Sequence, residues 1–338
     1  MELLEFCQKL PKIELHAHLN GSLSPETLTV LNTPIEDIKT YQLLTKLDCI
    51  EDQLNLAFTL FKIAHNATNM IESTYLATKH VIEEFHKDNV IYLELRTTPR
   101  AEPQMTKRDY VNTIIKAIRE QNLITVKLLL SINRGHCLKE SEETLNLILE
   151  MHELYPDIIK GVDLSGNPNV GIFSEAMFIK ARKSGLKITL HCAEVLNNEE
   201  VKQMLEFKPD RIGHGTFIHP TYGGSTENWK LCSDLRIPLE CCLTSNVLCN
   251  TVQSYKEHHM CEWVENNLPF NINTDDKGVF STTLTKEYFY AAHHLNLSKE
   301  SLYNCSCIAI DSSFASEEEK LKLKTYLKEW KDKHLELF

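Results

Sequence analysis

Eight short runs of apolar and β-branched residues recur along the chain, and sequence with helical periodicity separates each run from the next. The runs span residues 13–19, 90–96, 125–131, 159–164, 186–191, 211–214, 237–243 and 269–274. Strands that alternate with helices favour a parallel sheet. Eight such units predict an α/β fold of the closed (β/α)8 TIM-barrel type, in which active sites lie at the C-terminal ends of the strands.

The length of the chain fits one large domain of this kind. Its 338 residues, 42% of them hydrophobic, can bury a sizeable core, and we expect residues 1–338 to form a single barrel domain. The segment 25–88 exceeds a single crossover, so we expect extra helices, including 51–66 and 70–88, inserted after strand one as a lid over the top face. Further helices are predicted between the later runs, among them one at 252–266. An open doubly wound sheet is the alternative, but no glycine-rich dinucleotide fingerprint follows the first run.

Charge and composition exclude several classes of partner. The formal net charge of −11 argues against non-specific binding of nucleic acid, which needs a basic surface. No stretch approaches the ~18 consecutive apolar residues of a membrane span, and the N-terminus carries no secretory signal pattern. The eleven cysteines are scattered and form no C-x-x-C pattern, which is typical of reduced thiols. We expect a cytoplasmic (cytosolic), monomeric protein with a small-molecule ligand.

Metal-binding residue types recur at the predicted strand ends. His16 and His18 lie two apart, so in a strand both imidazoles leave from the same face, and a polar turn follows at once. His191, His214 and Asp275 end the fifth, sixth and eighth runs. Three histidines and one aspartate suit Zn²⁺ and leave room for a water. From the residues alone, His214 is either a fourth nitrogen ligand or a base beside the metal.

Two acidic features lie next to these residues. Glu194 follows His191 by three positions, and it is either a solvated loop carboxylate or a proton donor beside an activated water. Asp275 and Asp276 place two carboxylates side by side. One of them can bind a metal while its neighbour orients the nucleophilic water, and the metal then compensates their repulsion.

Five motifs in chain order resemble those of the adenosine/AMP deaminase family of metal-dependent hydrolases: LHAHLNGS, DLSGNP, LHCAE, RIGHG and NTDDKGVF. The segments ELRTTPR, LLLSI and TDDKGVFST are similar to the adenosine deaminase-like branch, which holds the N6-methyl-AMP deaminases. The resemblance covers nearly the whole chain. It implies a hydrolase acting on C–N bonds that converts N6-methyl-AMP, and related N6-substituted purine nucleoside monophosphates, to IMP and an amine.

The resemblance also implies roles for residues at the matching positions. One Zn²⁺ per chain would be held by His16, His18, His191 and Asp275. Glu194 would protonate purine N1 while an activated water attacks C6. His214 would accept or orient the proton of that water, and Asp276 would hydrogen-bond the water or purine N7. The backbone N–H of Gly166 would hold purine N3, since a small residue permits a close approach.

Substrate contacts follow from the same resemblance. They fall on His18, Asn20, His65, Thr97, Thr98, Pro99, Arg100, Asn133, Gly166 and Asp276. Asn20 stands where adenosine-specific enzymes carry an aspartate, whose charge would repel a 5′-phosphate, whereas an amide can donate a hydrogen bond. Arg100 is predicted to bind that phosphate; Arg96 is a weaker candidate, with an internal salt bridge as its alternative role. Asn133 departs from the aspartate that the family has more often at this position.

Three other functions compete with this one. The first is plain adenosine deaminase activity, converting adenosine to inosine. The second is a phosphoesterase or amidase with two metals, which usually needs a carboxylated lysine where the fourth run ends in Asp163-Leu-Ser-Gly. The third is a metal-free binding module, which is expected to have lost a ligand. The number of Zn²⁺ ions per chain separates these classes.

Overall fold

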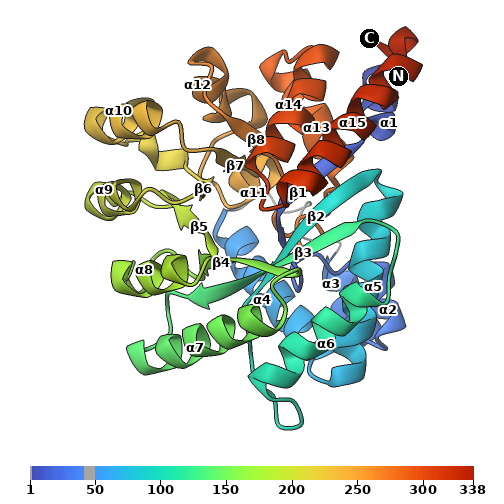
Figure 1. Cartoon of the computed structure of the whole chain (residues 1–338), viewed down its shortest axis with the longest axis vertical. Helices are drawn as coiled ribbons and strands as arrows, with labels where there is room; N and C mark the ends of the chain where they lie inside the picture. The colour runs from blue at the N-terminus through green and yellow to red at the C-terminus, as the bar shows by residue number, and fades with distance from the viewer. Residues whose placement is uncertain (1, 42–49) are drawn as a thin grey trace.

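Eight parallel strands form the centre of the molecule in the computed structural model, which describes residues 2–41 and 50–338 (Figure 1). The strands are β1 Lys12–His18, β2 Val90–Thr97, β3 Thr125–Asn133, β4 Ile159–Ser165, β5 Lys187–Cys192, β6 Arg211–His214, β7 Leu239–Cys241 and β8 Phe270–Ile272. Neighbours pair in chain order from β1 to β8, and a parallel bridge between Ala17 and Asp275 joins the first strand to the segment after the last. The prediction of a (β/α)8 TIM barrel is confirmed.

Helices surround the barrel (Figure 1). They are α1 Glu2–Lys9, α2 Pro25–Val30, α3 Ile35–Tyr41, α4 Ile50–Ala67, α5 Ile71–Lys87, α6 Lys107–Arg119, α7 Leu138–Leu154, α8 Glu175–Lys183, α9 Asn198–Phe207, α10 Thr226–Leu235, α11 Leu243–Leu248, α12 Met260–Glu265, α13 Leu284–Leu295, α14 Lys299–Ser312 and α15 Glu317–Lys333. Short 3-10 turns lie at η2 Thr216–Ile218, η3 Pro220–Tyr222, η4 Tyr255–Glu257 and η5 Leu335–Leu337.

The extra helices after the first strand are α2, α3 and α4. Ser24 begins α2, and its side chain accepts a 3.0 Å hydrogen bond from the Thr27 N–H, as an N-cap does. Glu84 of α5 accepts hydrogen bonds from Ser24 and Thr27 and pairs with Lys277, so it joins the inserted helices to the loop after β8. Residues 42–49, part of the segment that we expected to act as a lid, lie outside the described residues.

Three predicted boundaries were wrong, all in the last third of the chain. The predicted strand 237–243 ends at Cys241, because the chain turns there into α11. The predicted strand 269–274 ends at Ile272, and Asp275 beyond it has a left-handed backbone (φ 59°) that no strand continues. The predicted helix 252–266 is instead η4 followed by α12. Between them His258 and His259 are buried and hydrogen-bonded, which an unbroken surface helix would not allow.

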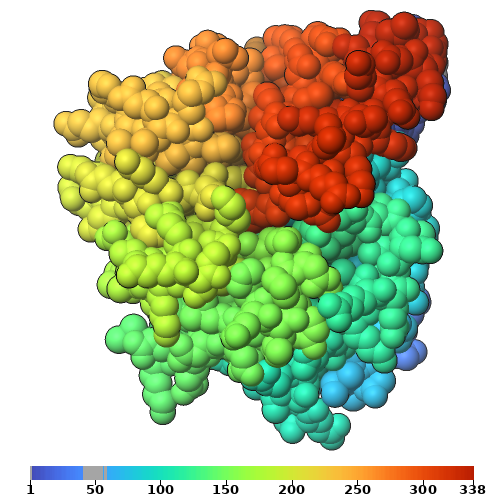
Figure 2. Space-filling view, viewed as in Figure 1, coloured from blue at the N-terminus to red at the C-terminus, as the bar shows by residue number. Residues whose placement is uncertain are grey.

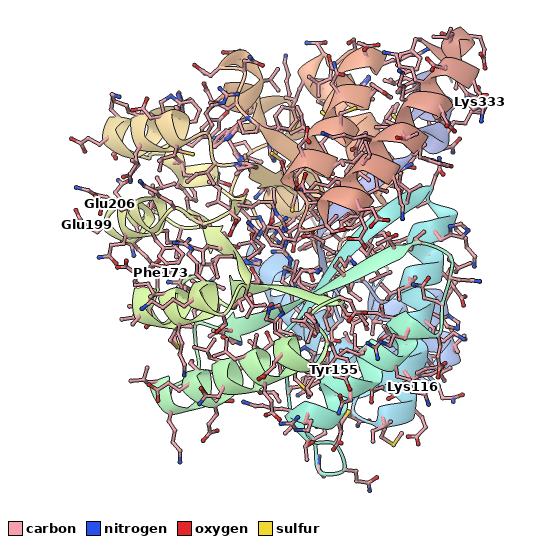
Figure 3. The ribbon with its side chains drawn as sticks, in the orientation of Figure 1. Lys116, Tyr155, Phe173, Glu199, Glu206 and Lys333 are labelled. Atoms are coloured by element: carbon pink, nitrogen blue, oxygen red, sulfur yellow. The ribbon has the colours of Figure 1, made fainter. Side chains whose placement is uncertain are left out.

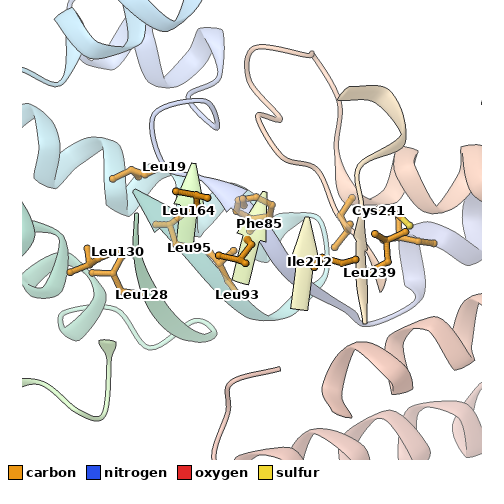
Figure 4. Close-up of a cluster of buried hydrophobic side chains, with 14 of the residues drawn as sticks. Leu19, Phe85, Leu93, Leu95, Leu128, Leu130, Leu164, Ile212, Leu239 and Cys241 are labelled. Carbon is orange, nitrogen blue, oxygen red and sulfur yellow. The ribbon is translucent and has the colours of Figure 1, made fainter. Parts of the chain in front are cut away.

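Side chains along the strands alternate between two environments. Leucines such as Leu93 and Leu95 of β2 belong to a buried apolar cluster that also includes Phe85 of α5 (Figure 4). The residues between and after them, Glu94 and Arg96, are also buried, but they form ion pairs with groups on other strands. The period-2 alternation of a strand therefore separates an apolar layer from a barrel interior filled with paired charges.

The C-terminal helices pack against the barrel. In Figure 2 their red atoms lie directly against the green atoms of the middle of the chain. One contact is the ion pair of Glu319 on α15 with Lys127 of β3, at 2.6 Å. Charged side chains such as Glu199 and Glu206 of α9 point outward from the ring of helices (Figure 3). Among the described residues, no helix combines the length and the apolar character that a membrane crossing requires.

Candidate active site and metal centre

Both histidines of the first strand reach one point at its C-terminal end. His16 is fully buried, and its Nδ1 lies 2.6 Å from Glu240 Oε2. Its buried Nε2 has no hydrogen-bond partner among the described residues and lies 3.3 Å from Asp275 Oδ1. His18 Nε2 lies 3.4 Å from the same oxygen and 3.1 Å from His191 Nε2. Burial holds the pKa of His18 well below its usual value, which keeps this imidazole neutral and able to bind a metal.

His191 is held by a carboxylate in the same way as His16. Its Nδ1 lies 3.0 Å from Asp163 Oδ1 at the bottom of the site. A carboxylate on Nδ1 fixes the tautomer and the ring orientation and leaves Nε2 for a metal. The structure therefore brings together His16, His18, His191 and Asp275, the residues that the sequence placed at the ends of the first, fifth and eighth strands.

The spacing of these atoms fits a zinc ion. Ligands 2.0–2.1 Å from a tetrahedral Zn²⁺ are separated from one another by about 3.3 to 3.4 Å. The three close separations just given, 3.1, 3.3 and 3.4 Å, lie near that value. His214 Nε2 is 3.9 Å from Asp275 Oδ2, which is longer. A second set, which has His214 in place of His18, could also hold a metal: the ligand atoms of His16, His191, His214 and Asp275 lie within 4.8 Å of one another.

His214 lies beside this centre and faces Glu194. Its Nε2 is 3.7 Å from Glu194 Oε2. Its Nδ1 lies 3.5 Å from the amide nitrogen of Asn246, whose oxygen is 3.1 Å from His258 Nε2. Burial lowers the pKa of His214, so its neutral form, which can accept a proton, is favoured. Glu194 is half-buried, so a carboxyl group and an imidazole face each other beside the candidate metal centre.

Asp275 and Asp276 are in different electrostatic states although they are adjacent. Burial alone would raise the pKa of Asp275, but the adjacent imidazoles of His16, His214 and His18 together hold it well below its usual range. Burial, followed by the neighbouring Asp275 carboxylate, raises the pKa of Asp276. Within residues 2–41 and 50–338, Asp276 Oδ1 has no hydrogen-bond partner. A Cβ on Gly21 would lie 1.6 Å from this oxygen, so glycine is required at position 21. One carboxylate is thus suited to a cation and the other to a neutral hydrogen bond.

Two site residues have an unusual backbone. His214 and Asp275 have φ angles of 61° and 59°, in the left-handed region that non-glycine residues rarely adopt. Such conformations cost about 1–3 kcal/mol each and cluster at functional sites. Asp275 is secured by its neighbours, because its N–H donates to the His16 carbonyl (2.8 Å) and its carbonyl accepts from the His18 N–H (2.9 Å).

Three of the predicted phosphate-site residues meet at Tyr110. Its hydroxyl lies 2.7 Å from Thr97 Oγ1 and 3.3 Å from Asn20 Oδ1. The Arg100 guanidinium lies over the Tyr110 ring, 5.2 Å from its centroid, and also donates to Thr68 Oγ1 at 2.7 Å. Asn20, Thr97 and Arg100 therefore form one polar group.

The other predicted contacts are placed as follows. The side chain of His65 is exposed near the end of α4, and its carbonyl accepts from Arg100 Nη2 at 3.3 Å. Thr98 is half-buried and Pro99 is buried, both between β2 and Arg100.

Asn133 and Gly166 lie together after β3 and β4. A Cβ on Gly166 (φ 106°) would lie 2.4 Å from Asn133 Oδ1, so this position requires glycine. Asn133 Oδ1 already accepts from the Gly135 N–H at 2.8 Å.

Arg96 does not face a phosphate site, and the internal salt bridge is the role that the structure supports. The side chain is fully buried, with Nη1 3.2 Å from Asp163 Oδ1 and Nη2 2.9 Å from Glu240 Oε2. These are the two carboxylates that hold His191 and His16.

Sequence reasoning missed Glu240, Asn246 and Tyr110 and gave Asp163 no role. For Arg96 it offered an internal salt bridge as the alternative, without naming the partners. A signal was present for Glu240, since a charge between Leu239 and Cys241 in an apolar run indicates a buried partner. That signal does not say which partner.

The comparisons with known proteins agree with this geometry. The family model described as Adenosine deaminase matches residues 11–330. A Homo sapiens protein named N6-Methyl-AMP deaminase is 40% identical over 336 residues, which cover 96% of this chain and 94% of that one.

Solved structures from Arabidopsis are similar over the whole barrel. The apo N6-methyl-AMP deaminase from Arabidopsis thaliana is 37% identical, with a TM-score of 0.87 and coverage of 98% of this chain and 100% of that one. An Arabidopsis ADAL structure complexed with IMP is 36% identical, with a TM-score of 0.84 and coverage of 98% and 99%. The chain belongs to the adenosine deaminase family and is a deaminase, a hydrolase that acts on C–N bonds.

Proposed function

We propose that this deaminase is zinc-dependent and converts N6-methyl-AMP, with related N6-substituted purine nucleoside monophosphates, to IMP and an amine. One observation carries the proposal. The Nε2 atoms of His16, His18 and His191 converge with Asp275 at zinc-like spacing beside Glu194, in a chain 40% identical to an N6-Methyl-AMP deaminase.

The reaction exchanges one C–N bond for a C–O bond. Water adds to purine C6, the C6–N6 bond breaks, and N6-methyl-AMP plus water gives IMP plus methylamine. A Zn²⁺ held by the four ligands would act as a Lewis acid and lower the pKa of a water. Glu194 would donate a proton to purine N1, and His214 would take the proton of the attacking water. Asp276 would hydrogen-bond that water or purine N7.

Substrate recognition in this proposal depends on neutral donors and one cation. Asn20 offers an amide where a carboxylate would repel a phosphate, and Arg100 lies in the same polar group. Asn133 and the backbone of Gly166 would contact the nucleoside part.

Adenosine deaminase activity is the second candidate, and one observation favours it. The Arg100 guanidinium already pairs with Glu102 and donates to Thr68, so part of its charge is compensated without a phosphate.

A substrate panel tests the proposal. The purified protein is given AMP, adenosine, N6-methyladenosine and N6-methyl-AMP, and the products are separated by chromatography. We expect conversion of N6-methyl-AMP to IMP, with both nucleosides left unchanged. In a parallel panel, Asn20→Asp should lower kcat/KM for N6-methyl-AMP by about ten-fold or more, as a buried like charge opposes the phosphate. If adenosine is the best substrate of the wild type, the nucleotide assignment is wrong.

A further inference from the structure

Tyr110 is a buried residue that contacts three members of the predicted phosphate site. It lies on α6, outside the barrel strands, and its side chain has no exposed surface. Its hydroxyl reaches Thr97 and Asn20, and its ring lies under the guanidinium of Arg100. Asn20 and Thr97 are themselves buried, so these polar groups depend on one another for hydrogen bonds.

The hydrogen bonds in this group have a defined direction. A phenol carries one proton, and Tyr110 uses it to donate to Asn20 Oδ1 at 3.3 Å. Either hydroxyl of the 2.7 Å contact between Thr97 and Tyr110 could donate by geometry; with the phenol proton directed to Asn20, Thr97 is the donor and the Tyr110 oxygen accepts. Thr97 is therefore the first donor of a chain that ends at the Asn20 amide.

This direction decides which end of the Asn20 amide is left for a ligand. Its oxygen is engaged by Tyr110, and its nitrogen donates to no protein atom in the part of the chain that the structure describes. The opposite orientation would present the amide oxygen, which repels a phosphate. The oxygen and nitrogen ends of an asparagine amide are similar in shape. The hydrogen-bond partner of Oδ1 therefore determines whether Asn20 turns its N–H donors or its oxygen toward a ligand.

The aromatic ring supports the second phosphate-site residue. The Arg100 guanidinium lies 5.2 Å from the ring centroid, a separation typical of a cation–π contact. Hydrogen bonds to Thr68 Oγ1 and the His65 carbonyl hold the same guanidinium from the side of α4. Tyr110 thus contacts both Asn20, the neutral donor, and Arg100, the cation.

We propose that Tyr110 is a positioning residue for nucleotide specificity: its hydroxyl turns the Asn20 amide so that N–H donors face the 5′-phosphate, and its ring supports Arg100. The inference rests on the proposed nucleotide substrate. Tyr110 touches protein groups and acts through them.

Tyr110→Phe tests the role of the hydroxyl, because it keeps the ring, the packing and the cation–π contact. We expect KM for N6-methyl-AMP and the Kd of IMP to rise about ten-fold, the usual cost of losing a hydrogen bond that supports a charged ligand. The kcat value should change less than about two-fold, since Glu194 and the metal ligands are untouched. Tyr288→Phe is the matched control: Tyr288 is equally buried and its hydroxyl bonds Ser306 at 3.1 Å, and this variant should leave KM unchanged.

A double-mutant cycle shows whether Tyr110 acts through Asn20. In an Asn20→Ala background, Tyr110→Phe should raise KM less than two-fold further, because the amide that it orients is gone. Full additivity of the two effects would overturn the proposal, as would an unchanged KM in Tyr110→Phe, or an equal loss of kcat and bound metal.

The proposed function and the role of Tyr110 can be refuted independently of each other. A wild type that deaminates nucleosides as well as nucleotides refutes the proposed function, whereas a nucleotide-selective wild type with an unaffected Tyr110→Phe variant refutes only the role of Tyr110.

Discussion

At the scale of single residues, the site depends on which nitrogen of each imidazole carries a proton. Glu240 and Asp163 accept hydrogen bonds from Nδ1 of His16 and His191, which leaves both Nε2 atoms turned toward the centre and available to a metal. A histidine without such a partner can present either nitrogen. The carboxylates of Glu240 and Asp163 therefore select the ring orientation that a metal needs.

The proton donor can be tested at the same scale. Glu194→Gln keeps the size of the side chain but removes the acidic proton, so we expect kcat to fall by about 10² to 10⁴. Bound metal should be unchanged, because Glu194 is not one of the proposed ligands. Steady-state kinetics and metal analysis of the same preparation measure both quantities. Glu199→Gln, on the outer face of α9, is the control (Figure 3) and should behave as wild type. Glu194 has no role in proton transfer if its variant retains activity within a few-fold.

At the scale of elements, one arginine connects four strands. Arg96 of β2 bridges Asp163 of β4 and Glu240 of β7, and its Nη2 donates to the Leu15 carbonyl of β1 at 2.6 Å. The carboxylates in turn hold histidines of β1 and β5. A planar guanidinium can serve two carboxylates in fixed directions, which a lysine ammonium cannot do.

This connection predicts a loss of metal affinity in Arg96→Lys. The charge stays, but the bridge between Asp163 and Glu240 is lost, so we expect zinc affinity to fall about 10- to 100-fold, as is common for residues behind metal ligands. Competition with a chromogenic chelator measures the affinity. Arg182→Lys is the matched control, since Arg182 bonds backbone carbonyls of Phe207 and Lys208 away from the site. A folded Arg96→Lys protein with wild-type zinc affinity would contradict this prediction.

At the scale of the whole molecule, the predicted metal lies at the seam of the barrel. His16 and His18 belong to β1 and Asp275 follows β8, and backbone hydrogen bonds join these segments. A metal ligated from both sides would cross-link the first strand to the last. His191, on β5, extends the same link across the barrel.

Removal of the metal should therefore affect activity and stability together. We expect one Zn²⁺ per chain, and a chelator should abolish activity and lower Tm. Zinc at 100 times its Kd stabilises the folded state by about 2.7 kcal/mol, and its addition should restore both. Metal analysis, kinetics and a thermal melt measure the three effects. Two ions per chain would favour a binuclear centre, and full activity after chelation would exclude a role for the metal.

The alternation of runs was enough to predict eight strands and the barrel, because the two-residue repeat of a strand and the 3.6-residue repeat of a helix are local properties of the sequence. Boundaries failed where tertiary contacts overrode local pattern: the run 252–266 has helical composition, yet the buried rings of His258 and His259 interrupt it. The single-domain organisation and the monomeric state remain predictions.

The sequence by itself determined the barrel and the residue types gathered at the C-terminal ends of its strands, since short motifs such as His16-x-His18 place ligands by local geometry. The tertiary structure alone decided their partners. Glu240 lies 224 positions from His16, and Tyr110 lies 90 positions from Asn20. Hydrogen-bond direction, buried charge pairing and amide orientation depend on which strands and helices meet in space. The residue types that carry the chemistry can therefore be identified from the sequence, whereas the orientation of their side chains is set by the tertiary structure.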